Sequence, residues 1–157
     1  MKVVFQGEHG AYSEEAILQH FGSSVELVPH PTLKAVFDAV ERGEVDLGLV
    51  PVENTLEGSI VQTYDLLLES DLKVEAEVIL RIVHCLIANP SVTLKDVKRV
   101  YSHPQALGQC RSFLESRDYE AVATYDTAGS VKMLKDQGLK DAAAIASKRA
   151  AEVYGMA

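Results

Sequence analysis

The stretch VPVENTLEGSIVQTYDLL runs from Val50 to Leu67 and joins a predicted strand to a predicted helix. It begins at the end of an apolar strand, becomes polar, passes a glycine and enters an amphipathic helix. Parallel α/β proteins build ligand sites where a buried strand delivers polar side chains to the start of a helix. The polar side chains delivered here are those of Glu53, Asn54 and Thr55.

On both sides of this stretch, apolar segments typical of strands alternate with segments of helical spacing. This alternation predicts an α/β protein with mainly parallel sheets. The β-branched run 74–88 is too long for one simple strand and is expected to leave a first lobe, 1–76, and enter a second, 77–157. The other predicted strands are 3–5, 25–28, 45–50, 99–101, 121–124 and 142–146, and the predicted helices are 13–21, 33–40, 60–68, 104–114, 128–137 and 147–154.

Local signals mark several ends of these elements. Thr32 and Thr127 are predicted helix caps, and Pro104 suits the first turn of a helix. The strand 45–50 is almost wholly apolar, so we expect it to be buried on both faces of a parallel sheet.

Composition sets further bounds. The chain has 157 residues, 47% of them hydrophobic and 24% charged, which is enough for one globular domain or two small lobes. A formal net charge of -8 disfavours a nucleic-acid partner but leaves room for a small anion. No apolar run reaches the roughly 20 residues that cross a membrane, and no secretory signal precedes the first strand. A cytoplasmic protein with reduced thiols at Cys85 and Cys110 is expected.

Small or polar residues occupy four strand-to-helix junctions, at 10–13, 53–59, 102–105 and 126–129. Each helix start offers unpaired N–H donors and a partial positive charge, so several of them could hold a small anion. The alternative is that Ser13 and Thr127 are ordinary helix caps.

Two side chains could take part in proton transfer. Glu53 follows an apolar strand, and burial there would favour the neutral acid and a proton-donor role; a carboxylate bonded to backbone donors is the alternative. His103 lies between Ser102 and Pro104, which suits a ring positioned near a helix start. No second histidine or cysteine stands at ligand spacing, so a metal site is not expected.

Four motifs in this order resemble those of the prephenate dehydratase family. They are QGEHGAYSEEA (6–16), VPVENTLEGSIVQTYDLL (50–67), SHPQALGQC (102–110) and YDTAGS (125–130), and the resemblance spans nearly the whole chain. It implies a two-lobed fold like that of type 2 periplasmic binding proteins, with the active site in the interlobe cleft.

The resemblance also implies a reaction. Prephenate loses its ring hydroxyl as water and its ring carboxylate as carbon dioxide, which gives phenylpyruvate for phenylalanine biosynthesis. Aromatisation drives this step, so the protein must protonate the departing hydroxyl, hold the geometry and exclude water. Such chemistry requires no metal or organic cofactor. The expected partners are the substrate and, in a homo-oligomer, further copies of the chain, with no nucleic acid and no membrane.

Site residues follow from the motif positions. Glu53 and Thr127 are the candidate catalytic residues, Glu53 because of its place after an apolar strand. The resemblance implies that Thr127 and Gln105 donate hydrogen bonds to substrate oxygens. The substrate-binding residues that it implies are Ser13, Asn54, Thr55, Gly58, Ser102, His103, Gln105 and Ala128.

The sequence departs from the family pattern at one point. Family members carry a Thr-Arg-Phe segment whose threonine is regarded as catalytic, and often a phenylalanine-binding ACT domain; neither occurs in these 157 residues. Activity is therefore expected to be weak or absent in this chain alone. A fragment of a longer dehydratase, a short homologue that binds a small anion without turning it over, and a site completed by another polypeptide are the alternatives. Arogenate is an alternative substrate.

Overall fold

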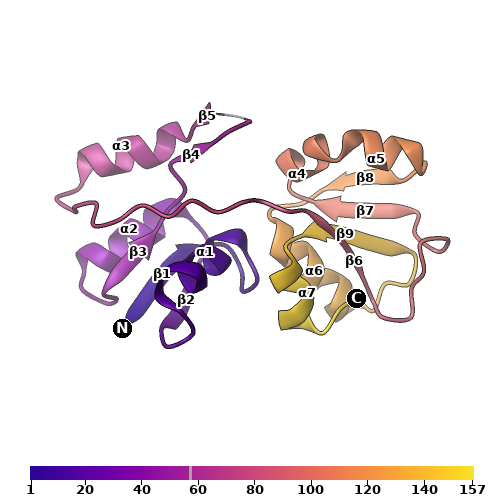
Figure 1. The fold of residues 1–157 in the computed structure, drawn as a ribbon, viewed down its shortest axis with the longest axis horizontal. Coiled ribbons are helices and arrows are strands. Elements are labelled where there is room, and N and C mark those ends of the chain that lie inside the picture. The colour runs from indigo at the N-terminus through magenta and orange to yellow at the C-terminus, as the bar shows by residue number, and fades with distance from the viewer. Residues whose placement is uncertain (57) are drawn as a thin grey trace. The chain divides into compact units, whose positions relative to one another are not determined.

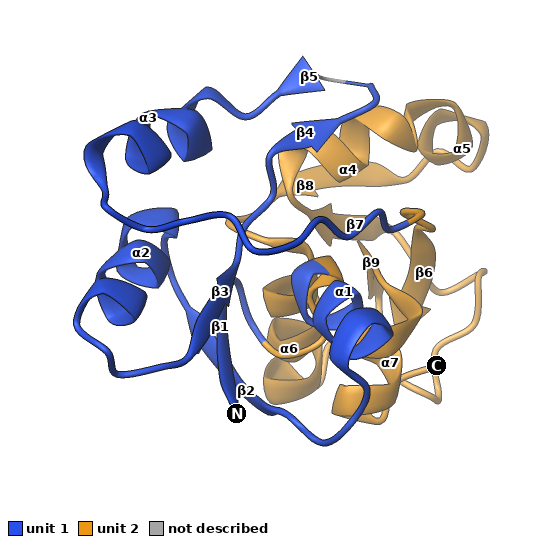
Figure 2. Ribbon diagram, turned by 60° about the vertical axis from the view of Figure 1, so that its left-hand side comes forward, with its two compact units in different colours: residues 1–8, 13–80 blue, residues 9–12, 81–157 orange. Residues whose placement is uncertain are grey.

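The computed structural model describes residues 1–56 and 58–157, which form two compact units (Figures 1 and 2). Unit 1 consists of residues 1–8 and 13–80, and unit 2 of residues 9–12 and 81–157. The boundary predicted between residues 76 and 77 lies a few residues before the observed boundary between residues 80 and 81. The predicted division also places residues 9–12 in the first lobe, whereas they belong to unit 2.

Unit 1 contains a parallel sheet in the order β2-β1-β3. Its central strand is buried, and α2 covers it through a cluster of Val4, Val36 and Ala39. Thr32 caps α2 as predicted, because its hydroxyl accepts a hydrogen bond from the Ala35 N–H at 3.2 Å. The elements are β1 (Lys2–Gln6), α1 (Tyr12–Phe21), β2 (Glu26–His30), α2 (Leu33–Glu41), β3 (Leu47–Leu49), β4 (Glu53–Asn54), β5 (Gly58–Ser59) and α3 (Val61–Glu69).

The prediction that 45–50 is a strand buried on both faces was wrong. β3 covers only Leu47–Leu49 and lies at the edge of the described sheet, with Gly48 exposed and its neighbours half-buried. Val45 and Val50, which lie on either side of β3 in the chain, pack against the α2 cluster. The doubly buried strand of unit 1 is β1, whose Val3, Val4 and Phe5 are at most 1% exposed.

Unit 2 is a sheet in the order β6-β9-β7-β8 with helices on both faces. β7, β8 and β9 are parallel, and β6 is antiparallel to β9. The elements are β6 (Cys85–Ala88), β7 (Arg99–Ser102), α4 (Pro104–Gln109), α5 (Arg111–Ser116), β8 (Glu120–Ala123), α6 (Thr127–Gln137), β9 (Ala142–Ala146) and α7 (Lys148–Tyr154).

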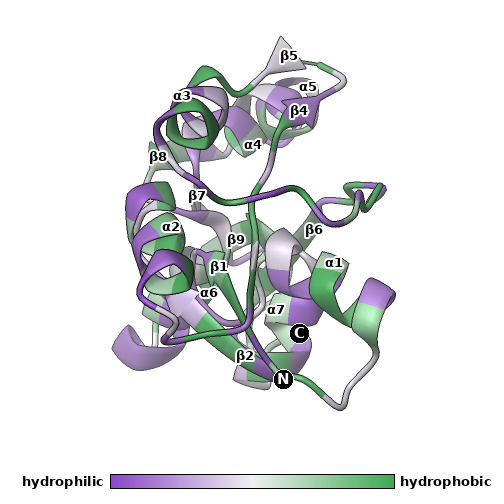
Figure 3. Cartoon of the chain, turned by 90° about the vertical axis from the view of Figure 1, so that its left-hand side faces the viewer, coloured by the Kyte–Doolittle hydropathy of each residue, from purple (hydrophilic) through white to green (hydrophobic). Residues whose placement is uncertain are grey.

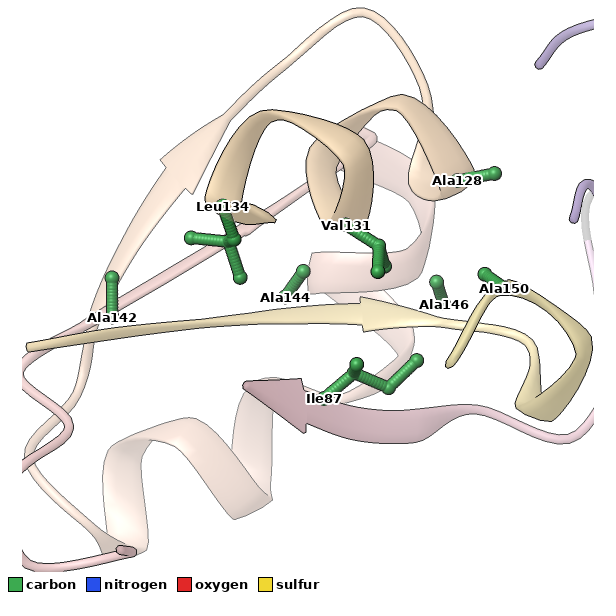
Figure 4. Close-up of a cluster of buried hydrophobic side chains, with 8 residues drawn as sticks. All are labelled: Ile87, Ala128, Val131, Leu134, Ala142, Ala144, Ala146 and Ala150. Carbon is green, nitrogen blue, oxygen red and sulfur yellow. The ribbon is translucent and has the colours of Figure 1, made fainter. Parts of the chain in front are cut away.

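The small residues of β9 allow close helix packing on both of its faces. Ala142, Ala144 and Ala146 contact the cluster formed by α6 and α7, whereas Ala143 and Ile145 face the cluster formed by α4 and α5. Figure 4 shows Leu134 and Val131 of α6 directed toward this strand, with Ile87 of β6 beside it. The period of two therefore places all five β9 side chains in a core.

Two further predicted elements differ from those observed. Residues 71–84 form no helix or strand, and only Cys85–Ala88 of the predicted 74–88 strand finds a partner, in β9. The predicted 104–114 helix is interrupted at Cys110 and forms two helices, α4 and α5; Phe113 of α5 is 40% exposed.

Unit 1 also presents apolar side chains to solvent. Figure 3 shows both hydrophobic and hydrophilic residues on α1 and α3. On α3, Val61, Tyr64 and Leu68 are exposed, while Thr63 is its buried residue. Within the described parts of the chain, no helix has the length and apolar character needed to cross a membrane.

Candidate functional site

The carboxyl ends of β7, β8 and β9 lie at one edge of the unit 2 sheet, because the three strands are parallel neighbours. A helix begins directly after each of them: α4, α6 and α7. The Thr124 N–H donates to the Ser102 carbonyl at 2.9 Å, which joins the segments that follow β7 and β8. Two of the predicted site segments, 102–105 and 126–129, are thus brought together within one unit.

The ring of His103 caps α4. Its Nδ1 accepts a hydrogen bond from the Gln105 backbone N–H at 3.2 Å, and Pro104 occupies the first turn as predicted. Because Nδ1 is the acceptor, the proton of the neutral ring lies on Nε2. His103 is exposed, so this Nε2–H is a donor that faces solvent.

Ser102 is fully buried, and its hydroxyl donates to the Ile145 carbonyl at 2.6 Å. This bond joins the ends of β7 and β9 and uses the only proton of the hydroxyl. Ser102 can therefore act toward a ligand only as an acceptor or through its main chain.

The predicted capping role of Thr127 was wrong. Asp126 is the N-cap of α6, and its carboxylate accepts a hydrogen bond from the Gly129 N–H. Asp126 is as good a cap as threonine and is preferred here because Gly129 leaves room for it: a Cβ at Gly129 would lie 2.9 Å from Asp126 Oδ1. The Ser130 hydroxyl also donates to the Asp126 carbonyl at 2.8 Å, and it lies 2.5 Å from the Thr124 hydroxyl.

This correction leaves the Thr127 side chain available. Thr127 is the first residue of α6 and is half-buried, and its hydroxyl makes no hydrogen bond with the described residues. The side-chain carboxamide of Gln105 is likewise unpaired within residues 1–56 and 58–157. Ala128 packs in the unit 2 core, so it can offer a ligand only its backbone N–H.

We expect cap and ligand-binding roles to separate on mutation. Asp126→Ala should lower the free energy of unfolding by about 1 kcal/mol, because it removes a helix cap. Thr127→Val should change it by less than about 0.5 kcal/mol, because no bond within the described chain is lost. Urea unfolding of the two variants measures this difference. Equal losses of unfolding free energy would indicate that Thr127, and not Asp126 alone, caps α6.

In unit 1, the polar stretch that follows β3 forms a short hairpin and does not lead directly into a helix. Asn54 pairs with Gly58 across β4 and β5, and the Asn54 carboxamide oxygen accepts a hydrogen bond from the Leu56 N–H at 2.9 Å. α3 begins only at Val61, and its N-cap Ile60 makes no side-chain cap bond. The expected delivery of 53–55 to a helix N-terminus was therefore wrong.

Two bonds fix this hairpin to α3. The Thr63 hydroxyl donates to the Pro51 carbonyl at 2.7 Å, and the Ile60 N–H donates to the Val52 carbonyl at 2.9 Å. Glu53 is exposed, so the burial that would make it a neutral acid is not present. Thr55 and Gly58 are also exposed in the hairpin, and Ser13 is half-buried in the first turn of α1.

The loop 9–12 was not recognised as part of unit 2. The Ser147 hydroxyl, fully buried, donates to the Gly10 carbonyl at 2.6 Å, and a Cβ at Gly10 would lie 2.6 Å from Ala150 Cα. The start of α7 therefore holds this loop at the same sheet edge as the segments after β7 and β9. The sequence signal was Gly10 itself, but its partner lies far along the chain.

Cys85 and Cys110 are free and half-buried. Burial raises the pKa of the Cys110 thiol, so it is protonated near neutral pH. Within the described residues, no group of three or more His, Cys, Asp or Glu side chains could hold a metal ion.

Comparison with known proteins defines the class. The family model for prephenate dehydratase matches residues 3–157, so the chain belongs to the prephenate dehydratase family. An Arabidopsis thaliana protein named arogenate dehydratase/prephenate dehydratase 2, chloroplastic, is 45% identical over 156 residues. This match covers 99% of the chain but 41% of that relative, so the chain spans less than half of the relative's length.

Solved structures agree with the fold. Prephenate dehydratase from Arthrobacter aurescens, in complex with L-Phe, has a TM-score of 0.88 at 29% identity and covers 98% of this chain and 52% of that one. GqqA, described as a novel type of quorum quenching acylase, has a TM-score of 0.92 at 34% identity and covers 100% of this chain and 57% of that one.

Proposed function

We propose that this chain contributes the substrate-binding part of a dehydratase that converts prephenate to phenylpyruvate, water and carbon dioxide. The observation that carries the proposal is the family match over residues 3–157. The reaction needs a proton at the departing hydroxyl, donors for two carboxylates and a site that excludes water.

Unit 2 supplies donors of the required kind. They are the Thr127 hydroxyl, the Gln105 amide, the His103 Nε2–H and the backbone N–H of Ala128 at the start of α6. All belong to segments that follow the neighbouring parallel strands β7 and β8. We assign them to the substrate's oxygens, since neutral donors and a helix start suit carboxylates in a protein of net charge -8.

Unit 1 supplies the other proposed side chains. Asn54, Thr55 and Gly58 belong to the hairpin, and Ser13 to the first turn of α1. Glu53 is our proposed proton donor to the departing hydroxyl. Because Glu53 is exposed, bound substrate must exclude water from it during the reaction.

Thr127→Val should weaken the binding of prephenate about 10-fold, because a hydrogen bond to a charged group is lost. Isothermal titration of the chain with prephenate measures the dissociation constant. Thr32→Val is the matched control, since it removes a cap from α2 and should lower stability without changing affinity. Equal affinities for Thr127→Val and the unchanged chain would remove Thr127 from the site.

Arogenate is the alternative substrate, and the Arabidopsis relative is named for both reactions. Titration with prephenate and arogenate in parallel distinguishes them. If the chain binds either ligand but a protein completed with the Thr-Arg-Phe segment forms no product, a non-catalytic anion-binding function is the better account.

GqqA is described as an acylase, and we do not propose that activity for this chain. An acylase needs a nucleophile beside a base. The ring nitrogens of His84 bond to Tyr12 and Gln109, and His103 Nδ1 bonds to the Gln105 N–H, so neither ring has a serine or cysteine among these partners.

The other expectations stay predictions. Assembly into a homo-oligomer is measurable by sedimentation. A cytoplasmic location is proposed from the sequence, although the Arabidopsis relative is named as chloroplastic.

A further inference from the structure

The half-buried ring of His84 links two segments of unit 2 that are far apart in the chain. Its Nδ1 lies 2.7 Å from the Tyr12 hydroxyl, and its Nε2 lies 2.8 Å from the Gln109 carboxamide oxygen. The Tyr12 and His84 rings also pack edge to face, with centroids 5.7 Å apart. The Tyr12 hydroxyl lies 3.1 Å from the Val83 carbonyl as well. Nothing in the sequence motifs pointed to His84.

Both partners of His84 belong to proposed binding segments. Tyr12 is the first residue of α1 and directly precedes Ser13; it lies two residues after Gly10, which Ser147 and Ala150 contact. Gln109 is the last residue of α4, whose first turn carries Gln105 and is capped by His103. Gln105 and Gln109 are four residues apart on this helix and therefore share a face.

α4 needs such an anchor because it is short. Pro104–Gln109 is far below the length at which a helix is stable without tertiary contacts. Ala106 and Leu107 hold its buried side. At its far end, the Gln109 carboxamide bonds to His84, and the next residue, Cys110, packs against the cluster that contains Ala106 and Leu107.

A count of protons shows that the ring can keep both links in either charge state. In the neutral ring, Nε2–H donates to Gln109 and Nδ1 accepts from the Tyr12 hydroxyl. In the charged ring, Nδ1–H donates to the Tyr12 oxygen, and Tyr12 turns its proton toward the Val83 carbonyl. No heavy atom has to move between these states, so the link holds across the change of charge.

We propose that His84 is a positioning residue for substrate binding, acting through Tyr12 and Gln109. The proposal rests on the proposed function, because the ligand is prephenate. His84 does not contact the substrate. It holds the 9–12 loop and α4 in the single arrangement that places the Gln105 amide and the His103 Nε2–H for the substrate's carboxylates.

Three substitutions separate the two links. His84→Leu removes both and should weaken prephenate binding about 10-fold, since two neutral hydrogen bonds are lost. His84→Asn keeps an acceptor near the position of Nδ1, and His84→Gln keeps a donor near that of Nε2; each should recover part of the affinity. Adding Tyr12→Phe should abolish the recovery in His84→Asn and change little in His84→Gln.

Isothermal titration with prephenate, well below the melting temperature, is the test. His20→Leu is the matched control, because His20 is an exposed histidine of unit 1 whose loss should leave affinity unchanged. If His84→Leu binds prephenate within twofold of the unchanged chain, or if neither partial substitution recovers affinity, the positioning role is wrong.

Nitrogen NMR of the histidine rings supplies a readout that does not depend on prephenate. In its neutral form, the His84 ring should carry its proton on Nε2 and accept at Nδ1. A ring that averages both tautomers contradicts the network itself. If the NMR result holds but the unchanged chain binds no prephenate, the proposed function fails; if the chain binds and His84→Leu does too, only the positioning role fails.

Discussion

Gly10→Ala should lower the free energy of unfolding of unit 2 by about 3 kcal/mol. Gly10 has φ +89°, a conformation that costs an L-residue about 1–2 kcal/mol. The new Cβ would also lie 2.6 Å from Ala150 Cα and 3.0 Å from Ala150 Cβ, and overpacking of this kind typically costs about 1–3 kcal/mol. The backbone at the start of α7 cannot yield easily, because the Ser147 hydroxyl bonds both to Gly10 and to the Ala150 N–H.

Gly22→Ala is the matched control for this prediction. Gly22 also has a positive φ, +73°, but among the described residues no atom beyond its chain neighbours lies within 4 Å of its added Cβ. It should therefore show only the backbone strain, about 1–2 kcal/mol. Urea unfolding of both variants isolates the steric term, and equal losses would show that the loop does not approach Ala150 as closely as described.

Leu134→Ala should destabilise unit 2 by about 3 kcal/mol, within the range of about 2–5 kcal/mol found for buried leucines. Leu134 is fully buried where α6 packs on β9, and its neighbours there include Ala142, Ala144 and Ile87 (Figure 4). Ala142 and Ala144 on the facing strand β9 are too short to extend into the cavity. Hydrogen exchange of the β9 backbone N–H groups reports this loss for unit 2 alone.

Leu68→Ala is the control, because Leu68 is also on a helix but is 86% exposed. Its effect should be no more than about 0.5 kcal/mol. A similar slowing or acceleration of β9 exchange in both variants would contradict the described core of unit 2.

Elements with strong local signals were predictable from the sequence. Thr32, Pro104 and Ser147 mark helix starts because a cap or a first-turn proline acts within a few residues of its own position. The small-residue strand 142–146 has the predicted bounds. The predicted α/β class agrees with the similarity of this fold to a solved prephenate dehydratase structure.

Features that depend on competing or distant partners were not predictable. Thr127 and Asp126 are adjacent cap residues, and only the close approach of Gly129 decides between them. The hairpin of β4 and β5 has two residues in each strand, too few for any periodic pattern. The apolar run before Cys85 lacks a pairing partner among the described strands, which its composition cannot reveal.

The site was predictable as a set of motif segments but not as hydrogen bonds. The sequence placed residues 102–105 and 126–129 after strands, and the parallel pairing of β7 and β8 brings them together. It could not show that the Ser102 hydroxyl donates to the Ile145 carbonyl, or that His84 bonds to both Tyr12 and Gln109. Those partners come from other strands and helices, so they depend on the tertiary fold.

We propose that this chain binds prephenate for dehydration. The most direct test of this proposal is the formation of phenylpyruvate from prephenate by the chain after it is joined to the Thr-Arg-Phe segment of a family member, with prephenate alone as the background. We expect clear turnover in the joined protein and weak or no turnover in the 157-residue chain. A joined protein that folds and binds prephenate but forms phenylpyruvate no faster than the background would contradict the account.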